Sequence, residues 1–139
     1  EVVSHVSAHD QRGKRSSRDD IQGVGMSGRM SRNKGKAGER ELAKRLSQIL
    51  KVKAYRAQQY HGAAGDADVL GVPGIHVESK RCESGSMYKW IEQAVSDAKA
   101  DDVPVVFHRK NGKQWLVICE LDDLVNLARA VVDLAGLDG

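Results

Sequence analysis

Three segments of the chain carry apolar side chains at every third or fourth position, which is the spacing of one face of an α-helix. They are residues 36–50, 86–100 and 122–134. In the first segment this apolar stripe consists of Leu42, Ala43, Leu46, Ile49 and Leu50. We therefore predict three amphipathic helices, each with one side turned toward a core.

Five shorter segments have the composition and the turn boundaries of β-strands. They are residues 53–59, 68–70, 75–80, 103–108 and 114–119. The dipeptide Asn111-Gly112 between the last two is the strongest short signal for a hairpin. The order helix, three strands, helix, two strands, helix predicts an α/β fold with a central mixed sheet flanked by helices.

The length of 139 residues favours a single folded domain, which we assign to residues 34–139. Residues 1–33 are rich in Ser, Arg, Asp and Gly and have no sustained hydrophobic period. We expect these residues to form a flexible, disordered basic arm. Met26 or Met30 could be the natural start, and the residues before it would then be a leader or another non-native addition.

The composition excludes several classes of protein. No stretch of about 18 apolar residues could span a membrane, and the N-terminus has no apolar leader segment. Cys82 and Cys119 are too few for a disulfide framework or a Cys-built zinc site, so we expect an intracellular protein with reduced thiols. Only six aromatic residues are present, which argues against binding single strands mainly by base stacking.

The net charge of +3 conceals a strong asymmetry along the chain. Up to Tyr60 there are 14 basic and 6 acidic residues, whereas the remainder has 8 basic and 13 acidic residues. Because polyanions bind to basic surfaces, the first part of the chain is expected to contact a polyanion.

A carboxylate falls on the apolar face of the first predicted helix. Glu39 precedes four members of the stripe by 3, 4, 7 and 11 residues, offsets that place all five side chains on one face. A lone buried carboxylate is costly or shifts its pKa. Alternatively, Glu39 lies near the first turn, favoured by the helix dipole, with its head in water. The neighbouring Glu41 lies about 200° around the helix and should be solvated.

Strand alternation places Glu78 and Lys80 on the same side of the strand at 75–80. His76 shares that side, where we expect it to be a packing residue. Asp68 opens the preceding strand, ten residues before Glu78, and the Gly-Pro turn between them suits a hairpin that sets the two side by side. Asp66 has the same strand parity and is the alternative to Asp68.

Convergence of Glu39, Asp68 and Glu78 would bring three carboxylates into a small space with one lysine. These carboxylates cannot all ionise together without a cation. Oxygen-only ligands at partial coordination suit Mg²⁺ or Mn²⁺, with water and substrate phosphate at the remaining positions.

These residues form three motifs that follow one another in a fixed order. The motifs are Lys34-Gly35-Lys36-x-x-Glu39-Arg40-Glu41-Leu42, Ala67-Asp68-Val69 and Ile75-His76-Val77-Glu78-Ser79-Lys80. From about Ser31 to Leu127 the chain resembles the PD-(D/E)xK nucleases, and it is most similar to the archaeal-type Holliday junction resolvases and their phage-encoded relatives. The resemblance implies a restriction-endonuclease-like α/β fold and a metal-dependent endodeoxyribonuclease that cuts branched DNA, leaving 5′-phosphate and 3′-hydroxyl ends.

The resemblance also implies a role for each motif residue. Asp68 and Glu78, with the carbonyl of Ser79, would hold Mg²⁺, for which Mn²⁺ would substitute. Lys80 would orient the attacking water or neutralise the charge that develops at phosphorus. Glu39 would bind a water on the metal or help to hold a second ion.

Two further positions bear on this correspondence. Ala67 replaces the proline that usually precedes the aspartate, whereas Val69-Leu70 after it supports Asp68 over Asp66 as the ligand. Gln93 matches a glutamine that related nucleases carry on the helix after the E-x-K motif; the alternative is an exposed helix residue.

Basic residues around the start of the first helix supply the expected grip on DNA. This cluster consists of Lys34, Lys36, Arg40 and Lys44, and further candidates for DNA binding are Arg56, His61 and Arg81. An ordinary solvated basic face is the alternative. The Gly- and Ala-rich loop at 61–65 has no base-reading groups, which favours recognition of DNA shape over sequence.

A four-way junction is two-fold symmetric, and two symmetric nicks need two active sites. We therefore expect a homodimer, with the last helix and the β-hairpin as contact surfaces. The enzyme would act inside the cell, in the cytoplasm or on the nucleoid, and a phage is one source of such a gene. The alternatives are another PD-(D/E)xK repair or restriction-like nuclease, or a non-catalytic DNA-binding module.

Overall fold

The computed structural model describes residues 18–58 and 66–136, with side chains from Gly28 onward apart from Ser31. The chain divides into two compact units, residues 1–32 and 33–139. The elements are α1 (Arg18–Leu50), β1 (Tyr55–Arg56), β2 (Val69–Leu70), β3 (Ile75–Arg81), α2 (Met87–Asp97), β4 (Val103–Arg109), β5 (Leu116–Ile118), a 3₁₀ helix (Leu121–Asp123) and α3 (Leu124–Ala135). No helix within these ranges is both long and apolar enough to cross a membrane.

The predicted order of helices and strands is confirmed, but several elements differ in length, α1 and β1 most of all. α1 begins at Arg18 instead of Lys36, because an established helix can extend through residues that have no apolar stripe. The part of the predicted arm from Arg18 onward is therefore helical, and its mobility stays a prediction. β1 pairs only at Tyr55 and Arg56, since its partner β2 has only two residues with which to form a ladder.

The five strands form one mixed sheet in the order β1-β2-β3-β4-β5. β3 and β4 are parallel, which requires a crossover connection, and α2 provides it. The other pairs are antiparallel. The hairpin predicted between β4 and β5 is confirmed, and Gly112 in its turn has a φ of +68°, which a glycine adopts without strain.

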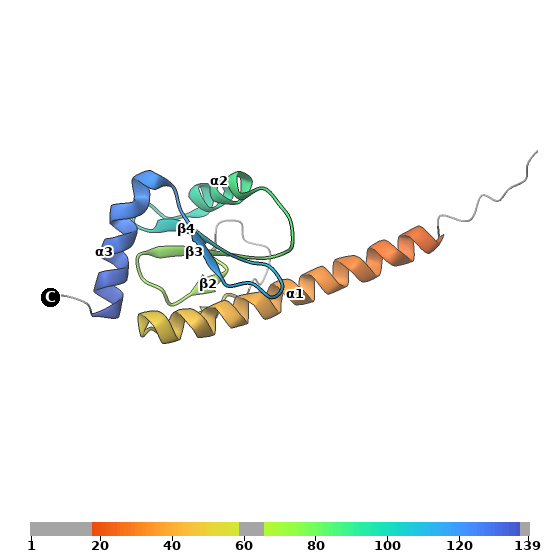
Figure 1. Ribbon diagram of the computed structural model, residues 1–139, viewed down its shortest axis with the longest axis horizontal. Coiled ribbons are helices and arrows are strands. Elements are labelled where there is room, and N and C mark those ends of the chain that lie inside the picture. The colour runs from red at the N-terminus through yellow and green to blue at the C-terminus, as the bar shows by residue number, and fades with distance from the viewer. Residues whose placement is uncertain (1–17, 59–65, 137–139) are drawn as a thin grey trace, which may run out of the picture. The chain divides into compact units, whose positions relative to one another are not determined.

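Helices cover both faces of this sheet (Figure 1). On one face, apolar residues of α1 such as Leu42 and Leu46 pack with Val77 and Phe107 of the central strands, and α3 adds a partly buried layer. On the other face, α2 buries Ala94 completely and sets the ring of Trp90 4.8 Å from that of His108. Side chains on either face of β3 are therefore buried.

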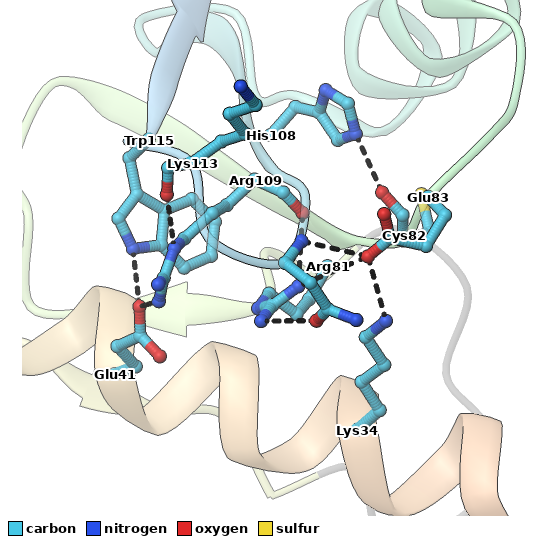
Figure 2. A network of polar contacts seen from close by, with 10 residues as sticks. Lys34, Glu41, Arg81, Cys82, Glu83, His108, Arg109, Lys113 and Trp115 are labelled. Carbon is cyan, nitrogen blue, oxygen red and sulfur yellow. Dashed lines mark hydrogen bonds and ion pairs between the residues drawn. The ribbon is translucent and has the colours of Figure 1, made fainter.

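A polar network joins α1 to the β4–β5 hairpin (Figure 2). Glu41 accepts hydrogen bonds from Arg109 Nη1 and, at 2.9 Å, from Trp115 Nε1. The expectation that Glu41 is solvated is therefore only partly met, since 39 % of its side chain is exposed. It rested on the helix alone, and the hairpin that covers this flank of α1 comes from a distant part of the sequence.

A second network ties α1 to the same hairpin through Glu83. Glu83 Oε1 accepts from the backbone N–H of Asn111 at 2.8 Å and pairs with Lys34 Nζ at 3.2 Å. The hydrogen bond from the Asn111 backbone is the largest of the causes that lower the pKa of Glu83. Arg81 Nη2 donates to Asn111 Oδ1 at 2.9 Å, so the hairpin turn is held by the end of β3 as well.

The close approach of α1 to the sheet depends on a glycine. A Cβ atom at Gly38 would lie 2.5 Å from Cβ of Arg81, whereas a Cβ atom at Gly35 would meet nothing within 4 Å. Both residues lie within the same helix. Gly38 is buried and Gly35 is half-buried.

We expect Gly38→Ala to lower the free energy of unfolding by about 1–3 kcal/mol, because overpacking outweighs the better helix propensity of alanine. Gly35→Ala should raise it by up to about 1 kcal/mol, since only propensity changes there. Urea unfolding followed by circular dichroism measures both. Equal effects of the two substitutions would show that the contact with Arg81 does not limit how closely α1 approaches the sheet.

Candidate nuclease site

Two acidic side chains meet where β2 pairs with β3. Val69 lies opposite Val77 in the antiparallel ladder, so the next position of this register sets Asp68 opposite Glu78. The backbone N–H of Asp68 donates to the carbonyl of Val77 at 2.8 Å. The hairpin arrangement that the sequence predicts is thus present, with Asp68 at the open end of the short strand.

The Asp68 carboxyl group is partly buried next to other acidic groups. Its Oδ2 accepts a hydrogen bond from the backbone N–H of Ser79 at 2.8 Å. Burial, followed by the negative charge of Glu78, raises the pKa of Asp68 from 3.8 to about 7, and the charge of Glu39 acts in the same direction. These three carboxylates therefore share one electrostatic environment.

Glu78 lies in the interior of the sheet, with only 3 % of the residue exposed. Its Oε1 is 2.8 Å from Nε2 of His76, which precedes it by two residues on the same face of β3. The hydrogen bond to Glu78 raises the pKa of His76, against the opposing effect of burial. The expectation that His76 only packs is incomplete, because its ring also contacts a predicted metal ligand.

Lys80 and Gln93 approach each other from β3 and α2. Lys80 Nζ donates to Gln93 Oε1 at 3.5 Å, a long hydrogen bond between side chains that are partly or fully exposed. α2 begins after Ser86, whose hydroxyl caps it by accepting from the backbone N–H of Lys89 at 3.4 Å. Gln93 is an exposed helix residue, which is the alternative prediction for it. Its side chain nevertheless contacts Lys80, the lysine of the E-x-K motif.

Glu39 extends from α1 toward the sheet and forms an ion pair. Its Oε2 accepts from Arg56 Nε at 2.7 Å, and each side chain is only about one-fifth exposed. Neither sequence interpretation of Glu39 includes this partner. No signal within the helix could have revealed it, since Arg56 is brought there by the pairing of β1 with β2.

Comparison with known protein families gives a match. The family described as "Phage putative PDDEXK endonuclease" matches residues 30–134, which is most of the chain. The chain belongs to this family. The comparisons with curated proteins and with solved structures find no match. The PD-(D/E)xK resemblance and the restriction-endonuclease-like α/β fold are thereby confirmed, and the protein is a nuclease.

The donor groups of this endonuclease fit a hard divalent cation such as nucleases of the superfamily typically use. Within residues 18–58 and 66–136, no three His, Cys, Asp or Glu side chains form a ready-made metal cage. Asp68 and Glu78 are nevertheless close enough for Glu78 to raise the pKa of Asp68, which a cation between them would reverse. A pair of carboxylates suits Mg²⁺, because Mg²⁺ keeps several of its waters.

The basic residues expected to bind DNA fall into two groups. Lys36, Arg40 and Lys44 are exposed and four residues apart, so they form a row along one flank of α1. In contrast, side chains of Lys34, Arg56 and Arg81 already bind acidic or amide groups of the protein. His61 lies outside the described residues.

We expect Asp68→Asn to stabilise the metal-free endonuclease at pH 8 and to abolish its stabilisation by Mg²⁺. When folding raises the pKa of a carboxyl group, ionisation of that group at a pH above its ordinary pKa destabilises the folded protein. Removing the charge of Asp68 should therefore add on the order of 2 kcal/mol to the free energy of unfolding. Urea unfolding with EDTA and with Mg²⁺ measures both effects.

The matched control is Asp66→Asn, which changes an exposed aspartate two residues earlier. This variant should retain wild-type stability in EDTA and the full gain with Mg²⁺. The reverse outcome, with the Mg²⁺ effect lost only in Asp66→Asn, would assign the ligand to Asp66.

Proposed function

We propose that this endonuclease is a Mg²⁺-dependent enzyme that cleaves branched DNA, and that it is a Holliday junction resolvase. The observation that carries the proposal is the pairing of Asp68 with Glu78 across β2 and β3, with Lys80 beside them on the strand of Glu78. This arrangement supports the assignment of Asp68, Glu78 and Lys80 to the PD-(D/E)xK motif, since the chain belongs to a PD-(D/E)xK endonuclease family.

Each residue of the site has a chemical task in phosphodiester hydrolysis. Asp68, Glu78 and the Ser79 carbonyl would hold Mg²⁺, or Mn²⁺ in its place, and Glu39 adds negative charge to the same environment. When bound, the ion polarises the scissile phosphate and lowers the pKa of a water ligand. Lys80 places its ammonium group to stabilise the charge that develops at phosphorus.

Gln93 supports Lys80 in this scheme. Its Oε1 accepts from Lys80 Nζ at 3.5 Å, which restricts an otherwise flexible side chain. Attack in line with the 3′ oxygen leaves 5′-phosphate and 3′-hydroxyl ends. Glu39 stays bound to Arg56, so Arg56 limits how strongly Glu39 can repel an approaching phosphate.

The row of Lys36, Arg40 and Lys44 supports DNA binding beside the site. These side chains are exposed on the helix that carries Glu39, and they project a continuous positive flank. Contacts with phosphates position DNA without reading its sequence, as an enzyme that recognises branched shape requires. Such an enzyme acts inside the cell, in the cytoplasm or on the nucleoid.

An apolar surface supports a homodimer, which supplies two active sites for a two-fold symmetric junction. Strand β5 is at the edge of the sheet, and a hollow of about 410 Å³ lies between it and α2. Met87, Tyr88 and Leu121 of this hollow are exposed, and β5 and α3 expose Leu116, Val117, Leu124 and Val125 as well. Exposed apolar surface marks an interaction site in many proteins.

We expect four-way junction DNA to be cut in Mg²⁺, with no cutting in EDTA. Glu78→Ala and Asp68→Asn should abolish cleavage but retain junction binding in a gel-shift assay, because each removes a metal ligand and a negative charge. Flapped and linear duplex DNA are the comparison substrates. Preferential cutting of either of these, or a monomer by light scattering with junction DNA bound, would contradict a resolvase and favour another nuclease of the superfamily.

A non-catalytic DNA-binding module, the alternative of a different class, does not fit the endonuclease family to which the chain belongs. It would bind junctions equally well with or without Asp68 and Glu78 and would cut no DNA under any metal condition. If both variants still cut, the proposed site is wrong even though the protein is a nuclease.

We expect Arg40→Gln to weaken junction binding and to reduce the slope of log affinity against log salt by about one phosphate contact. Arg45→Gln is the matched control, since Arg45 is exposed on the same helix about 140° away and bonds to Gln48. Fluorescence anisotropy measures the junction affinity of both variants at salt concentrations from about 50 to 200 mM, a range wide enough to distinguish such slopes. Equal slopes for both variants would locate the DNA elsewhere.

A further inference from the structure

One buried hydrogen bond at the candidate nuclease site has no part in the proposed chemistry. It joins His76 Nε2 to Glu78 Oε1 at 2.8 Å, and the two side chains are only 4 % and 3 % exposed. Both residues lie on the face of β3 that α2 covers. The bond is therefore shielded from water, where a hydrogen bond has its greatest effect on geometry.

The chemistry of the two groups fixes which of them donates. An ionised carboxylate has only acceptor oxygens, so the imidazole must supply the proton through Nε2. The other charged groups that act on the His76 ring, Asp97 of α2 and Asp68 at the start of β2, are also acidic. His76 is thus surrounded by carboxylates that accept hydrogen bonds, and its Nε2–H donates to Glu78 Oε1.

We propose that His76 is a positioning residue that orients the Glu78 carboxylate for metal binding. The inference rests on the proposed function, since it assumes that Glu78 is a metal ligand. By holding Oε1, His76 fixes the plane of the carboxylate and leaves Oε2 as the oxygen that can turn toward a cation shared with Asp68.

Loss of this donor would have two consequences. Oε1 would become a buried acceptor without a partner, and the carboxylate could rotate about its terminal bond. Residues that orient metal ligands typically change metal affinity or activity by about 10–100-fold when mutated. His76 would act in this way although it touches neither substrate nor metal.

The test compares variants of His76 with matched variants of His108. His108 is also buried, lies on the neighbouring strand β4, and donates through Nε2–H to the carbonyl of Cys82 at 3.0 Å. Its ring lies against that of Trp90, and its hydrogen bond is to a backbone carbonyl instead of a proposed metal ligand. Mn²⁺ affinity of the full chain without DNA, measured by titration calorimetry, is the readout, and urea unfolding gives stability separately.

We expect His76→Leu to weaken Mn²⁺ binding by about 10–100-fold. His76→Gln should restore affinity to within about threefold of wild type, because the glutamine Nε2–H reaches the position of the histidine Nε2–H. His76→Asn, whose amide is one carbon shorter, should behave like the leucine variant. His108→Leu should lose stability while its Mn²⁺ affinity stays within about threefold of wild type.

Three results would overturn the inference. The first is wild-type Mn²⁺ affinity in His76→Leu, or in His76→Asn where the leucine variant does not fold. The second is equal loss of affinity in the His76 and His108 variants, which indicates a general structural role. The third is a directly coordinated nitrogen in the electron spin echo spectrum of bound Mn²⁺, which would make His76 a ligand.

Failure of the proposed function gives a different pattern. In that case wild-type protein binds no Mn²⁺, or Glu78→Ala binds it as tightly as wild type does. Mn²⁺ binding that depends on Glu78 but not on His76 contradicts only the positioning role.

Discussion

The juxtaposition of two carboxylates in the middle of a sheet is the constraint on which this structure depends. Asp68, directly before β2, lies opposite Glu78 of β3, and burial together with mutual repulsion raises the pKa of Asp68 to about 7. Folding must therefore supply enough apolar burial to hold together groups that would otherwise separate. Val77, which precedes Glu78 on β3, is fully buried in the apolar core and provides part of this burial.

Helix α1 is held to the sheet from both flanks by charged groups that the helix itself supplies. Glu39 binds Arg56 of β1, and Glu41 binds Arg109 and Trp115 of the hairpin. Two acidic residues with one residue between them thus join opposite edges of the sheet through a single turn of helix. This arrangement fixes the rotation of α1 and hence the direction in which its basic row faces.

The sequence was sufficient for the order of the elements, because periodicity and turn residues are local signals. It was also sufficient for the meeting of Asp68 with Glu78, since a short hairpin is nearly a local feature. It did not reveal the partners of Glu39 and Glu41, which depend on how distant segments pack. The extension of α1 to Arg18 was missed for a related reason, because the prediction followed apolar residues and that part of the helix has no apolar stripe.

The two strands that carry the acidic pair differ greatly in length. β3 has seven residues and a neighbouring strand on each side, whereas β2 has only two residues. Backbone amides around Glu78 should therefore exchange with solvent far more slowly than those around Asp68. A cation bound by both carboxylates would couple the least protected part of the sheet to the most protected part, so β2 is where ligand binding would slow local opening most.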